Sequence, residues 1–218
     1  MRPLRAARRF EKGGIHKGSP HTDGRHVKRM GRLIVLVGPS GSGKTTLAKT
    51  LGLRVVCGMT TRPPRTGETD GIDYHFVSAD AFERLVADGA MAEHALYAGV
   101  RYGMPMSTVA LVRDAPDDGD AFVTILDAGG ADAMRRLVGA ERVRVVYVGA
   151  PITTLEARLR ARCSSSDEIQ RRMRQATTSE TTESYMARCD FRVSNDDGLL
   201  GETAAAIADL CRPVQKDA

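Results

Sequence analysis

The chain has 218 residues, of which 42% are hydrophobic and 27% are charged, values that are ordinary for a globular domain with a buried core. No apolar run is long enough to cross a bilayer, and no apolar segment follows the basic N-terminus as it would in a secretion signal. The four cysteines are widely spaced, which argues against a CxxC zinc site and a disulfide framework. We therefore expect a cytoplasmic domain with free thiols and no membrane partner, as a monomer or homodimer.

The net charge of +5 is concentrated in residues 1–29, which contain nine Lys or Arg residues and two acids. This segment carries a charge of +7, so residues 30–218 carry −2. It shows no helical or strand periodicity, and we expect a basic extension without packed structure, followed by a domain that begins near Met30. A nucleic-acid arm and an organelle-targeting peptide are the alternatives. Beyond a weak contribution from this tail, we expect no nucleic-acid binding.

Apolar runs alternate with helical patterns from residue 32 onward, which is typical of an α/β fold with a mostly parallel sheet. Continuous apolar runs predict core strands at residues 33–37, 54–57, 122–126, 143–148 and 191–194. Helical spacing predicts helices at residues 44–51, 130–138, 152–162, 166–177 and 200–211. Residues 58–110 break into short alternating pieces, which favour a small antiparallel insertion.

Residues 38–45 read Gly-Pro-Ser-Gly-Ser-Gly-Lys-Thr and match the P-loop pattern GxxxxGK[ST]. The motif follows a predicted strand and opens a predicted helix, so its backbone N–H groups can converge on phosphate oxygens. Lys44 would neutralise charge between the β- and γ-phosphates of ATP, and the Thr45 hydroxyl would ligate Mg²⁺. The residues expected to contact ATP are Gly38, Pro39, Ser40, Gly41, Ser42, Gly43, Lys44, Thr45, Thr46 and, late in the chain, Asn195.

A P-loop alone does not identify the acceptor, so the residues that follow it must decide. The segments Thr60-Thr-Arg-Pro-Pro-Arg-Thr-Gly-Glu68 and Asp70-Gly-Ile-Asp-Tyr-His-Phe76 are followed by Glu93, by Tyr102-Gly103 and by Asn195-Asp-Asp197. From about Arg32 to the C-terminus this series resembles guanylate kinase, which implies Mg²⁺-dependent phosphoryl transfer from ATP to GMP or dGMP. The resemblance implies a P-loop three-layer αβα fold with an inserted acceptor-binding lobe at about 58–110 and an Arg-rich helical lid at about 158–178.

The acceptor side of the site is also implied by this resemblance. Arg62 and Arg65 lie on a proline-stiffened loop and can present two guanidinium forks to the GMP phosphate, while Tyr74 and Tyr102 can add hydroxyl donors. A solvated basic loop and aromatic packing are the respective alternatives. The acceptor residues implied in this way are Arg62, Arg65, Tyr74, Glu93, Tyr102 and Gly103.

Three arginines and one aspartate complete the expected machinery. Arg158, Arg162 and Arg172 match family positions that close over the transferring phosphoryl group, where they would be catalytic together with Lys44. A solvated helix surface is the alternative for the arginines. Asp127 ends a predicted strand and would hold Mg²⁺ indirectly, and a carboxylate that caps the following helix is the competing interpretation.

The chain departs from the family where the guanine base is read. Gly58 stands where a serine usually contacts the base, Met104 where Ser or Thr donates to it, and residues 128–130 where the family has an aspartate and a Gln-Gly pair. Glu93 remains as the partner for the guanine N1–H and exocyclic amine. Two alternatives therefore stay open: a kinase for another nucleoside monophosphate or a ribose bisphosphate, and a non-catalytic guanylate-kinase-like interaction module. The intact Lys44 counts against the module.

Overall fold

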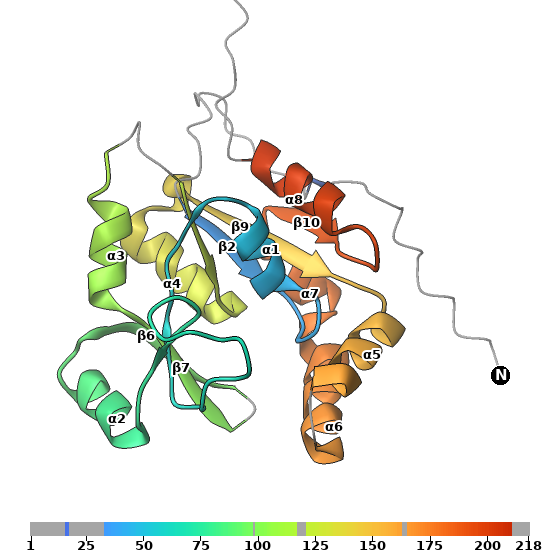
Figure 1. Cartoon of the computed structure of the whole chain (residues 1–218). Helices are drawn as coiled ribbons and strands as arrows, with labels where there is room; N and C mark the ends of the chain where they lie inside the picture. The colour runs from blue at the N-terminus through green and yellow to red at the C-terminus, as the bar shows by residue number, and fades with distance from the viewer. Residues whose placement is uncertain (1–15, 18–32, 98, 117–120, 163–164, 211–218) are drawn as a thin grey trace, which may run out of the picture.

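The computed structural model describes residues 16–17, 33–97, 99–116, 121–162 and 165–210 (Figure 1). The central sheet contains, in spatial order, β1 (His16–Lys17), β10 (Phe191–Ser194), β9 (Val143–Gly149), β2 (Leu33–Val37), β8 (Phe122–Ile125) and β3 (Arg54–Val55). A second sheet contains β5 (His75–Phe76), β4 (Met59–Thr60), β7 (Val100–Pro105) and β6 (Met91–Tyr97). The α-helices are α1 (Lys44–Thr50), α2 (Ala79–Ala87), α3 (Met106–Arg113), α4 (Ala128–Val138), α5 (Ile152–Arg162), α6 (Ser166–Gln175), α7 (Glu183–Met186) and α8 (Leu200–Asp209).

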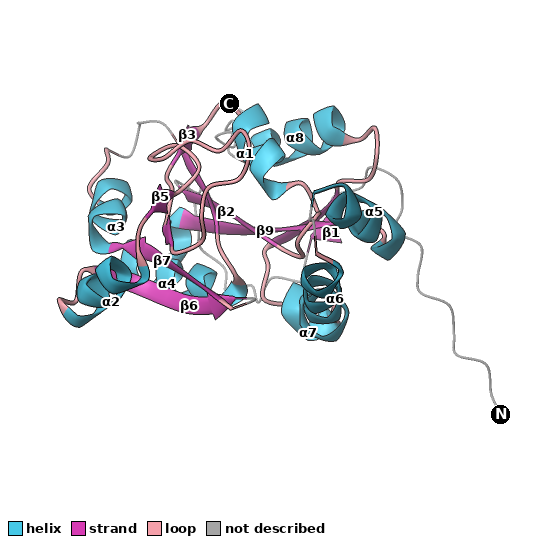
Figure 2. Cartoon of the chain, turned by 60° about the horizontal axis from the view of Figure 1, so that its bottom comes forward, coloured by secondary structure: helices cyan, strands magenta, loops and turns pink. Residues whose placement is uncertain are grey.

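The central strand β2 is buried at every residue, because helices cover both faces of the sheet (Figure 2). Successive side chains alternate between the faces, so Leu33 packs in the cluster that contains Met134 of α4. Its neighbour Ile34 packs in the other cluster, with Leu47 of α1 and Ile207 of α8. The pairs β2–β8, β2–β9, β9–β10 and β3–β8 are all parallel. The predicted three-layer α/β fold with a mostly parallel sheet is confirmed.

Several predicted elements end at other residues than the observed ones, and three observed helices were not predicted. The strand predicted at 54–57 ends at Val55, although the Val56 N–H still donates to the Val123 carbonyl at 2.9 Å. The helix predicted at 166–177 is α-helical only to Gln175 and continues as a π-helix, Ala176–Glu180. The helices α2, α3 and α7 were not among the predicted elements, and α2 and α3 fall in the region that was interpreted as short alternating pieces.

The insertion at 58–110 is a mixed lobe rather than the antiparallel one predicted. The pairs β4–β7 and β6–β7 are antiparallel, but β4 and β5 run parallel. Residues 61–74 lead from the end of β4 back to the start of β5, and a connection of this length is what a parallel pair requires. The lobe projects from one side of the central sheet together with α2 (Figure 1).

The basic segment 1–29 is described only at His16–Lys17, where it forms β1 and pairs antiparallel with Arg192 and Phe191 of β10. These two residues depart from the expectation of a tail without packed structure, and the rest of the tail lies outside the described residues. Cys57 and Cys189 are free thiols, whereas Cys163 and Cys211 also lie outside the described residues. Within the described ranges, no helix has the length and apolar character needed to cross a membrane.

Candidate active site

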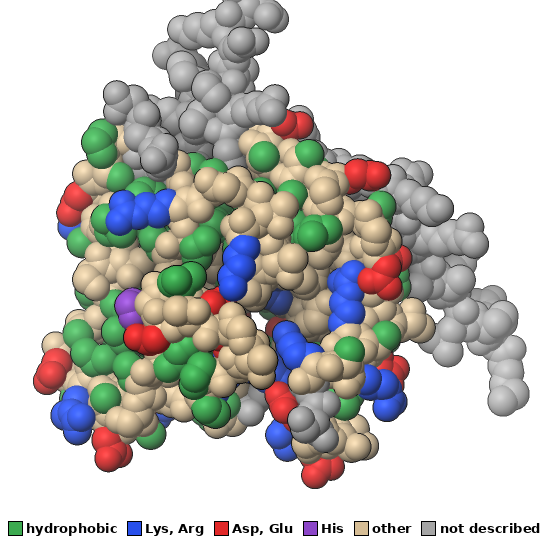
Figure 3. All heavy atoms as spheres, viewed as in Figure 1, with side chains coloured by type: hydrophobic (Ala, Val, Ile, Leu, Met, Phe, Trp, Pro, Cys, Tyr) green, Lys and Arg blue, Asp and Glu red, His purple; other side chains and the backbone are tan. Residues whose placement is uncertain are grey.

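A cavity of about 310 Å³ opens between the P-loop, the inserted lobe and the segment formed by α5 and α6. Lys and Arg side chains gather around a hollow on this face of the molecule (Figure 3). The predicted residues that line the cavity are Gly38, Ser40, Gly41, Gly43, Lys44, Thr45, Thr46, Arg62, Arg65, Tyr74, Glu93, Tyr102, Gly103, Asp127, Arg158, Arg162 and Arg172. Three other residues predicted to contact ATP, Pro39, Ser42 and Asn195, are not part of its lining.

The P-loop connects β2 to α1 with three glycines at positive φ, Gly38, Gly41 and Gly43, and at two of them an added Cβ would clash with neighbouring atoms. Gly38 has φ 130°, and a Cβ there would come within 2.3 Å of the Val148 carbonyl oxygen. Gly43 has φ 88°, and its Cβ would lie 2.3 Å from the Asn195 side-chain nitrogen. The glycines of the motif therefore let the loop pass close to β9 and β10.

Lys44 begins α1 and folds its side chain back over the loop. Its Nζ donates to the carbonyl oxygens of Gly38 at 2.7 Å and Pro39 at 2.8 Å. Burial lowers the pKa of Lys44 to about 8, against the opposing attraction of Glu180 and with the help of Arg162. Among the described residues, no carboxylate is in direct contact with the ammonium group, which sits in a cationic cavity where an anionic ligand would stabilise it.

Asn195 and Arg158 attach the P-loop to the segment between β10 and α8. The buried Asn195 side chain donates to the Ser42 carbonyl at 2.8 Å. Arg158 donates to the carbonyls of Gly41 at 3.2 Å and Asn195 at 2.9 Å, and it forms an ion pair with Asp197 at 2.7 Å. Of the three predicted lid arginines, Arg158 thus contacts the backbone of the loop.

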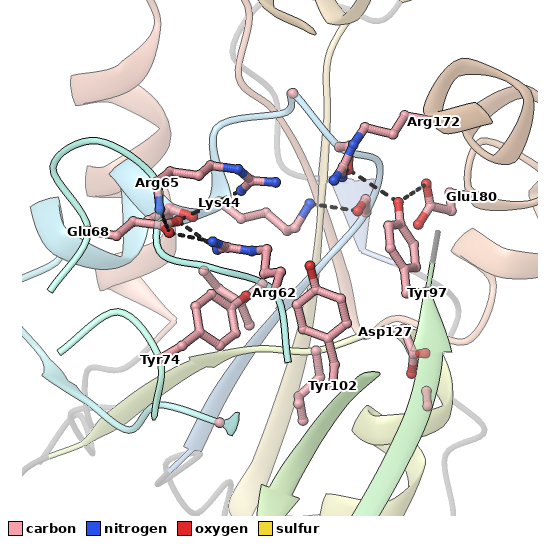
Figure 4. A pocket seen from close by; sticks show the side chains of 18 of the residues that line it. Lys44, Arg62, Arg65, Glu68, Tyr74, Tyr97, Tyr102, Asp127, Arg172 and Glu180 are labelled. Carbon is pink, nitrogen blue, oxygen red and sulfur yellow. Dashed lines mark hydrogen bonds and ion pairs between the residues drawn. The ribbon is translucent and has the colours of Figure 1, made fainter. Parts of the chain in front are cut away.

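The acceptor side is built around Arg62, which is only 8% exposed. Its guanidinium makes a fork with Glu68, with Nη1–Oε2 and Nη2–Oε1 distances of 2.5 and 2.7 Å (Figure 4). The same group lies 5.2 Å from the ring centre of Tyr74 and 5.4 Å from that of Phe76. Burial alone would raise the pKa of Glu68, but the bonds from Arg62 and from the Arg65 backbone N–H lower it overall. Arg62 is therefore held in a fixed position in the wall of the cavity.

Arg65 is the less constrained arginine of this pair, with 31% of its side chain exposed and a 3.7 Å contact to Glu68. Burial and the nearby charges of Arg62, Arg162 and Arg172 lower its pKa. A group of four guanidinium cations thus surrounds one part of the cavity. A dianionic phosphate placed there would relieve their mutual repulsion.

Glu93 points into the cavity from β6. Burial raises its pKa to about 7, with a smaller contribution from the neighbouring charge of Asp127. A Cβ on Gly130 would lie 3.3 Å from the Glu93 carboxyl carbon, so the glycine-rich start of α4 lies close behind the carboxyl group. Gly58 and Met104 offer no hydrogen-bonding side chain beside it, and Met104 is completely buried.

Asp127 caps α4, because its Oδ1 accepts a 2.7 Å hydrogen bond from the Gly130 N–H. The capping interpretation is therefore correct, and the magnesium role stays a prediction for the other carboxylate oxygen. Thr45 lines the same cavity and is exposed to it. One hydroxyl and one carboxylate suit Mg²⁺, which usually takes few protein ligands and fills its remaining positions with phosphate oxygens and water.

Residues 30–212 match the family model described as Guanylate kinase. The chain belongs to the guanylate kinase family. A guanylate kinase of Sphingopyxis alaskensis is 41% identical over 152 residues, which cover 67% of this chain and 68% of the relative. One of Bradyrhizobium diazoefficiens is 37% identical over 185 residues, or 83% of this chain and 81% of the relative. The crystal structure of guanylate kinase from Anaplasma phagocytophilum has a TM-score of 0.63 at 29% identity, covering 88% of this chain and 90% of that chain.

Three residues of this guanylate kinase site were not predicted as functional: Glu68, Tyr97 and Glu180. All three line the cavity. Glu68 lies inside the segment that carries the resemblance, but its pairing with Arg62 depends on the loop conformation. Tyr97 ends β6 and Glu180 ends the π-helix, 83 residues apart, and their contact arises only from tertiary packing. No sequence pattern marks either one.

Proposed function

We infer that the chain transfers the γ-phosphoryl group of ATP to GMP. The observation that carries this conclusion is a single cavity with a P-loop at one end, the Arg62–Arg65 cluster at another and the Glu93 carboxyl group beside them. Such a cavity can hold the triphosphate of the donor next to the single phosphate of the acceptor and leaves Glu93 to contact the acceptor base. The relatives described as guanylate kinases support GMP as the acceptor.

The chemistry expected of these residues is positioning and charge stabilisation. The acceptor is a phosphate oxygen that is already ionised, so general-base catalysis is not required. Lys44 and the P-loop amides bind the donor phosphates, and Arg162 and Arg172 stabilise the charge that spreads over the transferring group. Thr45, and indirectly Asp127, would hold Mg²⁺, which would supply positive charge to offset that of the donor phosphates.

Glu93 favours GMP over the alternative acceptors. An ionised carboxylate can accept from both the N1–H and the exocyclic amine of guanine, whereas adenine and the pyrimidines do not present this pair of donors. A ribose bisphosphate gives a half-buried carboxylate no comparable partner. The non-catalytic module is disfavoured because Lys44, Arg162 and Arg172 all line the cavity.

The direct test is a coupled ADP-release assay with ATP, Mg²⁺ and a panel of acceptors: GMP, dGMP, AMP, UMP, CMP and ribose 1,5-bisphosphate. We expect GMP and dGMP to be turned over and AMP to be at least about 100-fold poorer in kcat/KM, as expected when buried hydrogen-bonding groups lose their partners. If the protein releases no ADP with GMP but does so with another acceptor, that acceptor would take the place of GMP in this proposal. Omission of Mg²⁺ with excess EDTA should abolish the signal.

Replacing Arg65 with alanine should raise the KM for GMP by about ten-fold or more, because the acceptor phosphate loses a charged contact in a cluster that favours anions. The KM for ATP should change by less than about three-fold, since the donor phosphates are bound by the P-loop. Arg101→Ala is the matched control. Arg101 is a partly exposed arginine on β7 that pairs with Glu83 at 2.8 Å and does not line the cavity. An equal rise in both variants would argue against a phosphate role for Arg65.

A further inference from the structure

Four side chains from three parts of the molecule meet at one edge of the cavity. Ser40 belongs to the P-loop, Tyr97 to β6 of the inserted lobe, and Arg172 and Glu180 to the α6 and π-helix segment. Arg172 Nη1 is 2.9 Å from Ser40 Oγ, the Ser40 and Tyr97 hydroxyl oxygens are 3.2 Å apart, and Tyr97 Oη is 3.5 Å from Glu180 Oε2 (Figure 4). The Tyr97 hydroxyl therefore lies at the junction of all three parts.

The chemistry of the groups gives this chain of hydrogen bonds one direction. A guanidinium only donates and an ionised carboxylate only accepts, while each hydroxyl has a single proton to donate. Arg172 therefore donates to Ser40, Ser40 to Tyr97, and Tyr97 to Glu180. Each hydroxyl uses its one proton, with a cation at the first end and an anion at the last. Chains of this kind strengthen when their members polarise one another.

Burial makes the Glu180 end of this series of hydrogen bonds dependent on Tyr97, whereas the Arg172 end has a further partner. Glu180 is 4% exposed and Arg172 is 6% exposed. Burial raises the pKa of Glu180, although the charge of Lys44 and the Tyr97 hydroxyl act in the opposite direction. Arg172 has a second partner, since its Nε donates to Glu168 Oε1 at 2.8 Å. For Glu180, Tyr97 is the hydrogen-bonding side chain found among the described residues. Removing the phenol would leave a buried carboxylate poorly satisfied.

We propose that Tyr97 is a positioning residue that couples the inserted acceptor lobe to the P-loop and to Arg172 through its hydroxyl group. Ser40 stands in the loop expected to bind the donor phosphates, and Arg172 stands where it can reach the transferring group. Movement of the acceptor lobe toward its ligand therefore acts on a hydroxyl that is hydrogen-bonded to Ser40, the P-loop residue that accepts from Arg172. The 3.5 Å contact between Tyr97 and Glu180 is long, as contacts that tighten in a ligand complex often are.

The coupling predicts reciprocal effects on binding, in which each ligand tightens the other by the same factor. The inference rests on the proposed function, because it names GMP and ATP as the two ligands. If Tyr97 acted only through the packing of its ring, removing its hydroxyl group would leave kcat and the coupling between the two ligands unchanged. The Tyr97 ring lies 6.2 Å from the Tyr102 ring in an edge-to-face arrangement, and phenylalanine would preserve that contact.

Tyr97→Phe is therefore the test variant, and Tyr185→Phe is its control. Tyr185 Oη is buried and has no hydrogen-bond partner within the described part of the chain, so the control makes the same chemical change outside the network. Calorimetry should measure the affinity of adenylyl imidodiphosphate, a non-hydrolysable ATP analogue, with and without GMP. Steady-state assays should give kcat and both KM values.

We expect Tyr97→Phe to lower kcat by about ten-fold, as for loss of a hydrogen bond to a buried charged group, and to raise each KM, measured with the other substrate saturating, by the factor through which the two ligands tighten each other in wild type. The factor by which GMP tightens binding of the analogue should fall to near one, while Tyr185→Phe retains the wild-type values. Glu180→Gln should show the same pattern, and the double variant should be no worse than the poorer single variant by more than about two-fold.

Each other outcome contradicts the inference. Wild-type kcat and coupling in Tyr97→Phe would show that the hydroxyl is not a positioning group. Multiplicative losses in the double variant would show that Tyr97 and Glu180 act independently. A wild-type protein that does not release ADP with GMP would overturn the proposed function and this inference together. Turnover by wild type with an unaffected Tyr97→Phe would overturn the inference alone.

Discussion

Lys44→Ala will abolish phosphoryl transfer to every acceptor, with a fall in kcat of at least about 1,000-fold expected for loss of a cation that acts on the transferring phosphates. Lys44 Nζ is held by the carbonyls of Gly38 and Pro39, at the mouth of the P-loop. Donor phosphates at this loop would present oxygens that bind an ammonium group more strongly than neutral carbonyls do. The coupled ADP-release assay measures the loss, and a variant that retains a tenth of wild-type turnover would contradict the assigned role.

The fold should survive this substitution, because the lysine is not a favourable charge in the free protein. Burial lowers its pKa to about 8, so the folded state disfavours the protonated form. This penalty is fully present at pH 7. It decreases as the pH rises from about 8 toward the pKa of a lysine in the unfolded chain, so the contribution of Lys44 to the free energy of unfolding rises with pH in that window. We therefore expect thermal unfolding of Lys44→Ala at pH 7 to occur within a few degrees of wild type.

Lys49→Ala is the matched control for Lys44→Ala. Lys49 lies on the same helix, is half exposed, and pairs with Asp73 at 2.6 Å outside the cavity lining. Asp73 is only 2% exposed, so removing its partner should lower stability, but turnover of the folded protein should stay within about three-fold of wild type because Lys49 does not line the cavity. Comparable losses in both variants would point to damage to α1 rather than to a missing phosphate contact.

The donor half of the site could be predicted because its residues are contiguous in the sequence. Gly38 to Thr45 form one loop after one strand, and the motif alone places Lys44 at the start of α1. The α/β fold follows from similarly local signals, the apolar runs that alternate with helical patterns from residue 32 onward. These features depend on neighbours along the chain, so no tertiary information is needed to predict them.

The acceptor half was predicted only in part, because its contacts are not local. Arg62 and Arg65 could be named from their motif, but the fork between Arg62 and Glu68 depends on how the loop folds back. Tyr97 and Glu180 meet across 83 residues, and the π-helix that presents Glu180 leaves no recognisable spacing. Hydrogen-bonding networks of this type are determined by tertiary packing, which periodicity does not report.

Glu93→Gln should lower kcat/KM for GMP by about 100-fold or more, because an amide presents a donor where the guanine also presents donors. Binding of adenylyl imidodiphosphate should be unchanged, since Glu93 lies on the acceptor side. Glu83→Gln is the control: Glu83 is an exposed residue of α2 that pairs with Arg101 outside the cavity lining. Unaltered GMP kinetics in Glu93→Gln would mean that the base is read by other groups.

Because Glu93 must be ionised to accept hydrogen bonds from guanine, we expect kcat/KM for GMP to fall as the pH falls. Burial raises the pKa of Glu93 to about 7 in the free protein, so the carboxylate that guanine requires is lost as the pH falls through this value. The kcat/KM for GMP, which reports the free enzyme, should fall by about ten-fold for each pH unit below 7. Bound guanine stabilises the ionised form through two hydrogen bonds, so the corresponding limb in kcat should appear at lower pH. Glu93→Gln should lack the limb in kcat/KM.

This dependence should be steep because neighbouring residues cannot substitute for the carboxylate. Gly58 has no side chain, and a Cβ there would lie 2.7 Å from the Gly103 carbonyl oxygen, so the backbone leaves no room for one in this arrangement. Met104 is completely buried and carries no donor. Protonating Glu93 therefore removes the charged acceptor, and neither Gly58 nor Met104 can replace it. Discrimination between GMP and AMP should narrow as the pH falls from 8 to 6, and a constant ratio would show that Glu93 does not carry base selection.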